Sequence, residues 1–283
     1  MKSLPIRDIL KKINNEDAKV ASKIKSELKA IEVVADAFFK TIEQGGHVYY
    51  VGSGTSGRMG VLDAAELPPT FGVKKTLVKA LIAGGKKALI SAIEGSEDDL
   101  NQVKRDILHL HLSPDDMMIG IAASGRTPYT IQMLKVAKKA EMKTALISNM
   151  LPRPNYSFVD HHICVAVGKE VIEGSTRMKA GTAQKMILNM LSTAVMIKLG
   201  RTYHGKMVSL EMNNEKLKKR ALSILMDICQ ISRAKAISLM KQAKSDLKVA
   251  TVMYKCHMNP SDARKLLLQH KGDLDHALSY QAC

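Results

Sequence analysis

Two glutamates, Glu66 and Glu97, stand where a carboxylate could do acid–base chemistry. Glu66 falls in "DAAELPPTFG", where two prolines are expected to close a helix and to hold the side chain at the edge of a pocket. Glu97 falls in "IEGSEDD", a Gly-Ser break between helices. Two carboxylates with differently tuned pKa values are what general acid and general base catalysis require. The alternative for each is a surface or helix-capping residue.

A glycine-rich loop, "VGSGTSGRMG" at residues 51–60, directly follows an apolar run that begins at His47. Glycine permits a tight turn and a close approach of backbone N–H groups, and the hydroxyls of Ser53, Thr55 and Ser56 add donors. The helix expected next turns its positive N-terminal end to the same place, so the loop is predicted to hold a phosphate. A purely structural turn is the alternative. The loop is neither a Walker A motif nor a complete dinucleotide fingerprint.

Two further loops repeat the combination of glycine and hydroxyl residues. The loop "AASGRTP" ends another apolar run and supplies Ser124, Gly125 and Thr127. The loop "EGSTRMKAGT" opens an expected helix and supplies Ser175, Thr176, Arg177 and Lys179. If the three loops converge, they form a phosphate cup with hydroxyl, backbone and cationic donors.

Five short apolar runs that alternate with amphipathic segments must position these loops. Between residues 47 and 167 this alternation predicts an α/β fold, with a parallel sheet flanked by helices on both faces. Ligands of such sheets bind beyond the carboxyl ends of the strands, where the strand order reverses. Residues 1–46 are predicted to form N-terminal helices, 47–204 the sheet domain and 205–283 a small all-helical C-terminal domain.

The C-terminal region contains a weak internal repeat that appears at a shift of 27 residues. Ala236 matches Ala263, Asp246-Leu247 matches Asp273-Leu274, and Ala250 matches Ala277. Each copy is predicted to be a short helical hairpin. Two interpretations stay open: a protein-recognition module of the ubiquitin-associated type, or the favoured one, a lid or dimerisation element.

The chain is strongly basic, because it contains 43 Lys and Arg residues but only 27 Asp and Glu residues, which gives a net charge of +16. Such a charge attracts polyanions. However, it is spread over several helices, only 4% of the residues are aromatic and Trp is absent, so we expect no nucleic-acid binding. A basic surface with an anionic small-molecule ligand is favoured instead.

The sequence offers neither a metal site nor a membrane segment. The four cysteines form no CxxC pair, and the histidine pairs lack further ligands, so no metal is predicted. The N-terminus lacks the apolar stretch of a signal peptide, and the longest apolar run is too short to span a bilayer. A cytoplasmic protein without membrane contact is expected.

Taken together, "VYYVGSGTSGRMGVLDAAELPPTFG", "EGSEDD", "IGIAASGRTPY" and "EGSTRMKAGTAQKMILNMLSTAVMIKLGRTY" closely resemble the N-acetylmuramic acid 6-phosphate etherases. These bacterial enzymes have the sugar isomerase (SIS) fold and are related to the glucokinase regulatory protein. The resemblance runs from about residue 5 to the end of the chain. It implies a SIS-type sheet for the central domain.

The resemblance implies a lyase that cleaves the ether between D-lactate and C3 of N-acetylmuramic acid 6-phosphate during cell-wall recycling. It implies that the sugar opens, a base removes the C2 proton, lactate leaves with help from an acid, and water adds to the intermediate. By motif position the acid corresponds to Glu66 and the C2 base to Glu97. No metal or organic cofactor is implied. A homodimer with the site at the subunit interface is implied as well.

Three features depart from the family pattern. In "GKEVIEGSTRMK", Lys169 stands where relatives have Pro or Ala, and Glu173 stands where they have a small residue. The segment "HGKMVSLEMN" at 204–213 replaces a "GNLMVD" stretch. Two other functions stay open: a sugar-phosphate-sensing regulatory protein, and a sugar-phosphate isomerase or deaminase-like enzyme.

Overall fold

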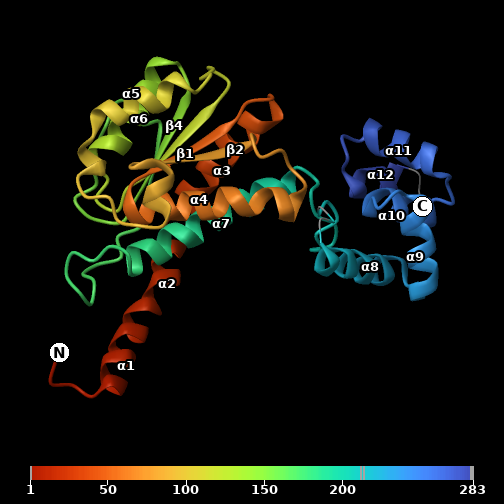
Figure 1. Cartoon of the computed structure of the whole chain (residues 1–283), viewed down its shortest axis with the longest axis horizontal. Coiled ribbons are helices and arrows are strands. Elements are labelled where there is room, and N and C mark those ends of the chain that lie inside the picture. Colours follow the sequence, from red (N-terminus) through yellow and green to blue (C-terminus); the bar gives the residue numbers. More distant parts are fainter. Residues whose placement is uncertain (1, 211, 213, 281–283) are drawn as a thin grey trace. The chain divides into compact units, whose positions relative to one another are not determined.

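The structure, a computed structural model, describes residues 2–210, 212 and 214–280 (Figure 1). It divides into two compact units. The first, called the sheet unit, contains the residues up to Ala65 and Lys75–Thr193; the second, called the helical unit, contains Glu66–Lys74 and the residues from Ala194 onward. The predicted domain boundaries after residues 46 and 204 stay a proposal. Glu211 and Asn213, within the unusual segment 204–213, lie outside the described residues.

The predicted helical region before the sheet is confirmed and consists of three helices. They are α1 (Ile6–Asp17), α2 (Lys19–Lys25) and α3 (Leu28–Glu43). Helix α3 buries Val34 and Phe38 completely. The Phe38 ring meets the Tyr50 ring edge-on, with centroids 6.4 Å apart, so α3 packs directly on the sheet.

The sheet has five parallel strands in the order β2-β1-β3-β4-β5. They are β1 (Val48–Gly52), β2 (Val78–Ile82), β3 (Met117–Ile121), β4 (Lys143–Ser148) and β5 (His161–Cys164). Every residue of β1 and β3 is buried, which explains why these strands read as continuous apolar runs. All five predicted strands are confirmed.

Helices cover both faces of the sheet, which confirms the predicted fold class (Figure 1). The connecting elements are α4 (Gly54–Phe71), the 3₁₀ turns η1 (Gly85–Leu89) and η2 (Ser96–Asp98), α5 (Leu100–Leu108), α6 (Pro128–Lys139) and α7 (Lys179–Lys198). Helices α5 and α6 lie on one face, where Tyr49 and Met118 belong to their core. Helices α3, α4 and α7 lie on the other face, where Tyr50 points.

A buried polar network ties α4 and α7 to the sheet. Asp63 accepts hydrogen bonds from Tyr50 Oη at 3.2 Å, from Asn189 Nδ2 at 2.7 Å and from Ser192 Oγ at 3.1 Å. Burial raises the pKa of the Asp63 carboxyl group, although these donors favour the charged form. These hydrogen bonds hold α4, which begins in the glycine-rich loop, against β1 and α7.

The prediction that Pro68 and Pro69 close the helix is wrong. Both prolines lie inside α4, which continues to Phe71. Each proline removes one helical N–H donor but leaves the helical φ angle intact, so the chain passes through them with weakened backbone bonding. Instead, α4 ends where Gly72 adopts a φ of 61° and donates its N–H to Pro68 O at 2.9 Å.

The helical unit contains α8 (Glu215–Cys229), α9 (Arg233–Gln242), α10 (Leu247–Lys255), α11 (Pro260–Gln269) and α12 (Leu274–Tyr280). The predicted hairpins are confirmed: α9 with α10 forms one copy of the repeat, and α11 with α12 forms the other. Asp246 accepts from Val249 N at 3.0 Å, and Asp273 accepts from His276 N at 3.1 Å. The matching aspartates thus begin the second helix of each copy.

A buried lysine lies in the helical unit. Lys248 is 9% exposed, and its ammonium group donates to the carbonyl oxygens of Gly200 and Gly272. Burial, together with the nearby Arg201 charge, lowers the pKa of Lys248 to about 8. None of the described helices of the chain is long and apolar enough to span a bilayer.

Candidate functional site

Two of the three predicted loops lie side by side at the carboxyl edge of the sheet. Strands β1 and β3 are paired, with Gly52 opposite Ile121. The loop after Gly52 leads into α4 and the loop after Ile121 leads into α6. The strand order places both loops where the chain direction across the sheet reverses, which is the usual ligand site of such sheets.

The β1 loop is tight enough to require glycine. A Cβ atom added to Gly52 would lie 2.7 Å from Gly57 N, and one added to Gly57 would lie 2.6 Å from Ile82 Cγ1. Ser56 is buried, whereas Ser53 and Thr55 are half-buried. Within the described part of the chain, none of these three hydroxyl groups has a hydrogen-bond partner. The loop therefore offers unused donors beside the N-terminus of α4.

The β3 loop is a turn around Gly125, which has a φ of 70°. Gly125 N donates to Ala122 O at 2.8 Å, and Arg126 N donates to Ser124 Oγ at 3.1 Å. Ser124 thus accepts one hydrogen bond from its own turn and keeps its hydroxyl proton for a ligand. Thr127 is the N-cap residue of α6, and its side chain makes no capping hydrogen bond.

The start of α7 lies against the β1 loop. A Cβ atom added to Gly181 would lie 3.1 Å from Thr55 Cγ2 and 3.6 Å from Thr176 O. Ser175 and Thr176, both half-buried, lie three to four residues before α7 begins at Lys179. The start of α7, which follows the "EGSTRMK" segment, is therefore close to the β1 loop; that all three loops form one phosphate cup stays a prediction.

The first turn of α7 is nevertheless occupied by a carboxylate of the same chain. Glu170 accepts hydrogen bonds from Lys179 N at 3.1 Å and from Ala180 N at 3.0 Å. These are N–H groups that an anionic ligand would otherwise use at a helix N-terminus. Sequence analysis missed Glu170, because nothing in its spacing distinguishes a helix cap from any other acidic residue.

The Lys179 side chain is also already hydrogen-bonded within the chain. It is 3% exposed, and Nζ donates to Glu16 Oε2 at 2.6 Å and to Lys169 O at 2.7 Å. The hydrogen bond from Lys179 is the main reason why the pKa of Glu16 falls to about 2. Lys179 therefore ties the end of α1 to the loop before α7, and its ammonium group is already hydrogen-bonded within the chain.

The two predicted catalytic glutamates are exposed. Glu97 lies in η2, directly after Gly95, which has a φ of 69°. Glu66 lies on α4, in the part of that helix that belongs to the helical unit. Neither carboxylate forms a hydrogen bond or an ion pair with a residue that the structure describes. Both are free to act on a ligand.

The segment that carries Glu97 is anchored at both ends. Arg58, in the first turns of α4, donates to Ser91 O at 3.0 Å, and Gln102 Oε1 accepts from Gly84 N at 2.7 Å. A cavity of about 450 Å³ lies beside Ser96 and Gln102. The β2 end of the sheet thus has room for a ligand, although Glu97 itself is not among the residues that line this cavity.

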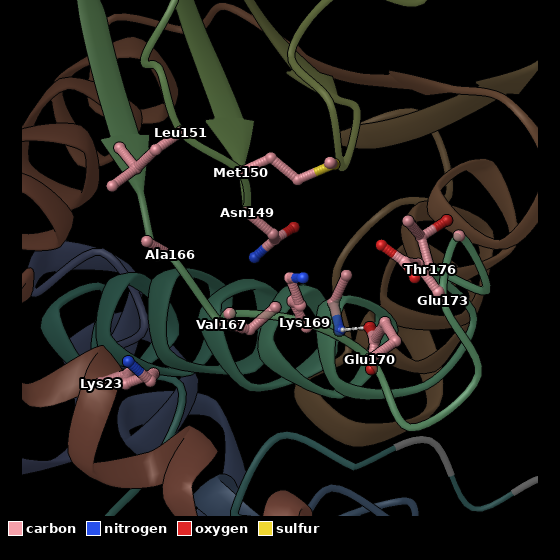
Figure 2. A pocket seen from close by; sticks show the side chains of 13 residues that line it. Lys23, Asn149, Met150, Leu151, Ala166, Val167, Lys169, Glu170, Glu173 and Thr176 are labelled. Carbon is pink, nitrogen blue, oxygen red and sulfur yellow. Dashed lines mark hydrogen bonds between the residues drawn. The ribbon is translucent and has the colours of Figure 1, made fainter.

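A second cavity, of about 460 Å³, lies at the ends of β4 and β5 (Figure 2). Asn149 and Lys169 lie on facing sides of it, while Glu173 and Thr176 lie together on a third side. Both charged departures from the family pattern, Lys169 and Glu173, therefore line one cavity that also touches the predicted site at Thr176. Neither side chain is paired with another residue among those described.

The described residues contain no group of three or more His, Cys, Asp or Glu side chains that could hold a metal ion. The hydroxyl and backbone donors of the β1 and β3 loops can hold a phosphate, and an accessible carboxylate can move a proton on a bound molecule.

Comparison with known proteins identifies the fold of the sheet unit. A model of the glucokinase regulatory protein N-terminal SIS domain matches residues 30–138, and a SIS domain model matches residues 104–194. The chain is similar to a phosphoheptose isomerase structure from Francisella tularensis, with a TM-score of 0.51, 19% identity and coverage of 66% of this chain and 97% of that one. This likeness supports the SIS fold.

Full-length relatives give the family. The chain is 44% identical over 272 residues to an N-acetylmuramic acid 6-phosphate etherase of Bacillus licheniformis, covering 96% of this chain and 90% of the relative. It is also 44% identical over 271 residues to the enzyme of that name from Clostridium acetobutylicum, with the same coverage. The chain belongs to the N-acetylmuramic acid 6-phosphate etherase family.

Proposed function

We propose that the protein cleaves the D-lactyl ether of N-acetylmuramic acid 6-phosphate, giving N-acetylglucosamine 6-phosphate and D-lactate. The observation that carries this proposal is the 44% identity with etherases over 96% of the chain. The unused hydroxyl groups at the β1 and β3 strand ends support it, because a sugar phosphate needs such donors.

The phosphate is proposed to bind between the β1 and β3 loops. Ser53, Thr55 and Ser56 donate from one side, and Ser124 and Thr127 donate from the other, where the turn at Gly125 brings them to the ligand. The N-terminal ends of α4 and α6 add favourable partial charge. Ser175 and Thr176 then contact the phosphate or the sugar from the third side. A contact between Lys179 and the phosphate stays a prediction. It would require the Lys179 ammonium group to leave or share its hydrogen bond with Glu16.

The chemical step is proposed to use two carboxylates. Once the sugar ring has opened, the C1 aldehyde makes the C2 proton acidic, and Glu97 removes it. The electron pair forms the C2–C3 double bond as the C3–O bond breaks, and Glu66 protonates the leaving lactate oxygen. Water then adds across the C2–C3 double bond: its hydroxyl group bonds to C3, and Glu97 returns a proton to C2. Each proton transfer needs an accessible carboxylate, which both residues have.

Two further expectations go with this proposal. The family resemblance suggests that the protein acts as a homodimer with the site at the subunit interface, and that it works in the cytoplasm. Both stay predictions.

The test is D-lactate release from N-acetylmuramic acid 6-phosphate by the purified protein. Glu97→Gln and Glu66→Gln should each lower kcat by about 10²- to 10⁴-fold, the usual range for lost acid or base catalysis. Asp98→Asn, an exposed acid in the same turn as Glu97, is the matched control and should keep full activity.

Binding of the product N-acetylglucosamine 6-phosphate, measured in parallel, keeps the result unambiguous. If the wild-type protein binds the product but releases no lactate, the etherase proposal is wrong and a sugar-phosphate-sensing regulatory protein is favoured. If the wild-type protein interconverts aldose and ketose phosphates but releases no lactate, a sugar-phosphate isomerase is favoured.

A further inference from the structure

The segment Met150–Tyr156, which follows β4, is fastened to the β3 loop by three contacts. Arg126 Nη2 donates to Pro152 O at 3.1 Å, and Tyr156 Oη donates to Gly125 O at 3.3 Å. A Cβ atom added to Gly125 would lie 2.8 Å from Pro154 Cγ, so the β3 loop and this segment are in close contact. The segment therefore packs against the turn that presents Ser124.

The other side of the same segment is fastened to β5. Arg153 Nε donates to His162 Nδ1 at 3.0 Å, and Arg153 Nη2 donates to His162 O at 2.9 Å. Since Nδ1 accepts a hydrogen bond, the proton of the neutral ring is on Nε2, which donates to Ser148 Oγ at 2.8 Å. The segment thus bridges the β3 loop and a buried part of the sheet.

The conformation of the β3 loop depends on the orientation of one peptide unit. Gly125 has a positive φ, and its carbonyl group, held by Tyr156, belongs to the peptide whose N–H group donates to Ser124 Oγ. Holding the carbonyl therefore also holds the Arg126 N–H group and, through it, the direction of the Ser124 hydroxyl group.

We propose that Tyr156 and Arg153 are positioning residues that hold the β3 loop in its phosphate-binding conformation. Neither residue belongs to the three hydroxyl loops; they act through Gly125 and Ser124. The proposal rests on the proposed function in so far as the ligand is a sugar phosphate. It goes beyond that function by assigning roles to residues outside the predicted site.

Tyr156→Phe tests the proposal with little risk to the fold. The variant loses only the hydroxyl group and keeps the ring, which stacks on Phe158 with centroids 4.9 Å apart. Loss of one such hydrogen bond should raise the Kd for N-acetylglucosamine 6-phosphate about threefold to tenfold. KM for the etherase substrate should rise by the same factor, with kcat unchanged. Tyr254→Phe, in α10 of the helical unit, is the matched control.

A double variant shows whether Tyr156 acts through Ser124. If it does, adding Tyr156→Phe to Ser124→Ala should raise the Kd by less than twofold, because the group that Tyr156 orients is already gone. Equal effects in both backgrounds, or no effect of Tyr156→Phe alone, would overturn the proposal. Arg153→Met should weaken binding in the same way, while thermal unfolding shows that each variant is folded.

The binding measurement also separates this proposal from the proposed function. A wild-type protein that binds the sugar phosphate but releases no lactate would end the etherase proposal and leave the positioning test intact. A wild-type protein that binds neither the sugar phosphate nor inorganic phosphate would overturn the phosphate role of the β3 loop and the positioning proposal with it.

Discussion

Gly181 packs directly on Thr55, and a Cβ atom at Gly181 would lie 3.1 Å from Thr55 Cγ2. This contact joins the first turn of α7 to the glycine-rich loop after β1. It connects the residues just after the "EGSTRMK" segment with the loop predicted to bind phosphate. The absence of a side chain at residue 181 is therefore part of the site's geometry.

Gly181→Ala should raise KM for the etherase substrate by about tenfold, because the added methyl group displaces Thr55 by a few tenths of an ångström. Adding Thr55→Ser should restore KM, since serine keeps the hydroxyl group and lacks the methyl group that collides. Steady-state kinetics on the single and double variants check this. A double variant as impaired as Gly181→Ala would show that the methyl contact is not the cause.

Glu170→Ala should lower the free energy of unfolding by about 1–2 kcal/mol, since two N–H groups at the start of α7 lose their acceptor. Glu170→Gln should cost less, because its amide oxygen can still accept from one of them. Denaturant unfolding measures both. Glu173→Ala, three residues along the same loop and exposed, should change stability by less than about 0.5 kcal/mol.

Lys248 should make stability depend on pH in the alkaline range. Its folded-state pKa of about 8 lies below the unfolded value of 10.5, so between these values the unfolded chain binds more protons. The free energy of unfolding should therefore gain up to roughly 3 kcal/mol from this group as the pH rises from 8 to 10.5. Lys248→Met should lack this gain. Parallel slopes for the two proteins would contradict the burial argument.

His162 should give a second pH dependence, in the acidic range. Burial, with a smaller contribution from Arg153, lowers its pKa to about 4, below the unfolded value of 6.5. Between these values the unfolded chain takes up the proton more readily, so stability falls as the pH drops through this window. The difference between wild type and His162→Asn isolates this effect from that of neighbouring Asp160. A constant difference from pH 7 to pH 4 would refute it.

The fold could be predicted from the sequence to a large extent, because strong periodic patterns decide it. The runs that form β1 and β3 are buried throughout and could be recognised by length and composition alone. The two glycine–hydroxyl loops at their ends follow from the rule that parallel sheets bind ligands there. The matched aspartates of the C-terminal repeat proved to be helix caps in both copies.

The remaining features depend on contacts between distant residues. Pro68 and Pro69 were expected to end a helix, but the α4 backbone continues through them to Gly72. The motif around Lys179 predicts a contact with the phosphate, yet its ammonium group pairs with Glu16, which precedes it by 163 residues. Burial and long-range pairing of this kind leave no signature in local spacing, and Glu170 escaped notice for the same reason.

The internal cap on α7 has a consequence for what ligand binding will change. Since Glu170 already holds the amides of Lys179 and Ala180, these amides should exchange slowly with deuterated solvent even in the ligand-free protein. The amides that gain protection with bound sugar phosphate should instead be those of the β1 loop, since Gly125 N and Arg126 N of the β3 loop already donate within their own turn. The exchange footprint of the ligand should then cover the β1 loop, while the amides at the start of α7 show no change.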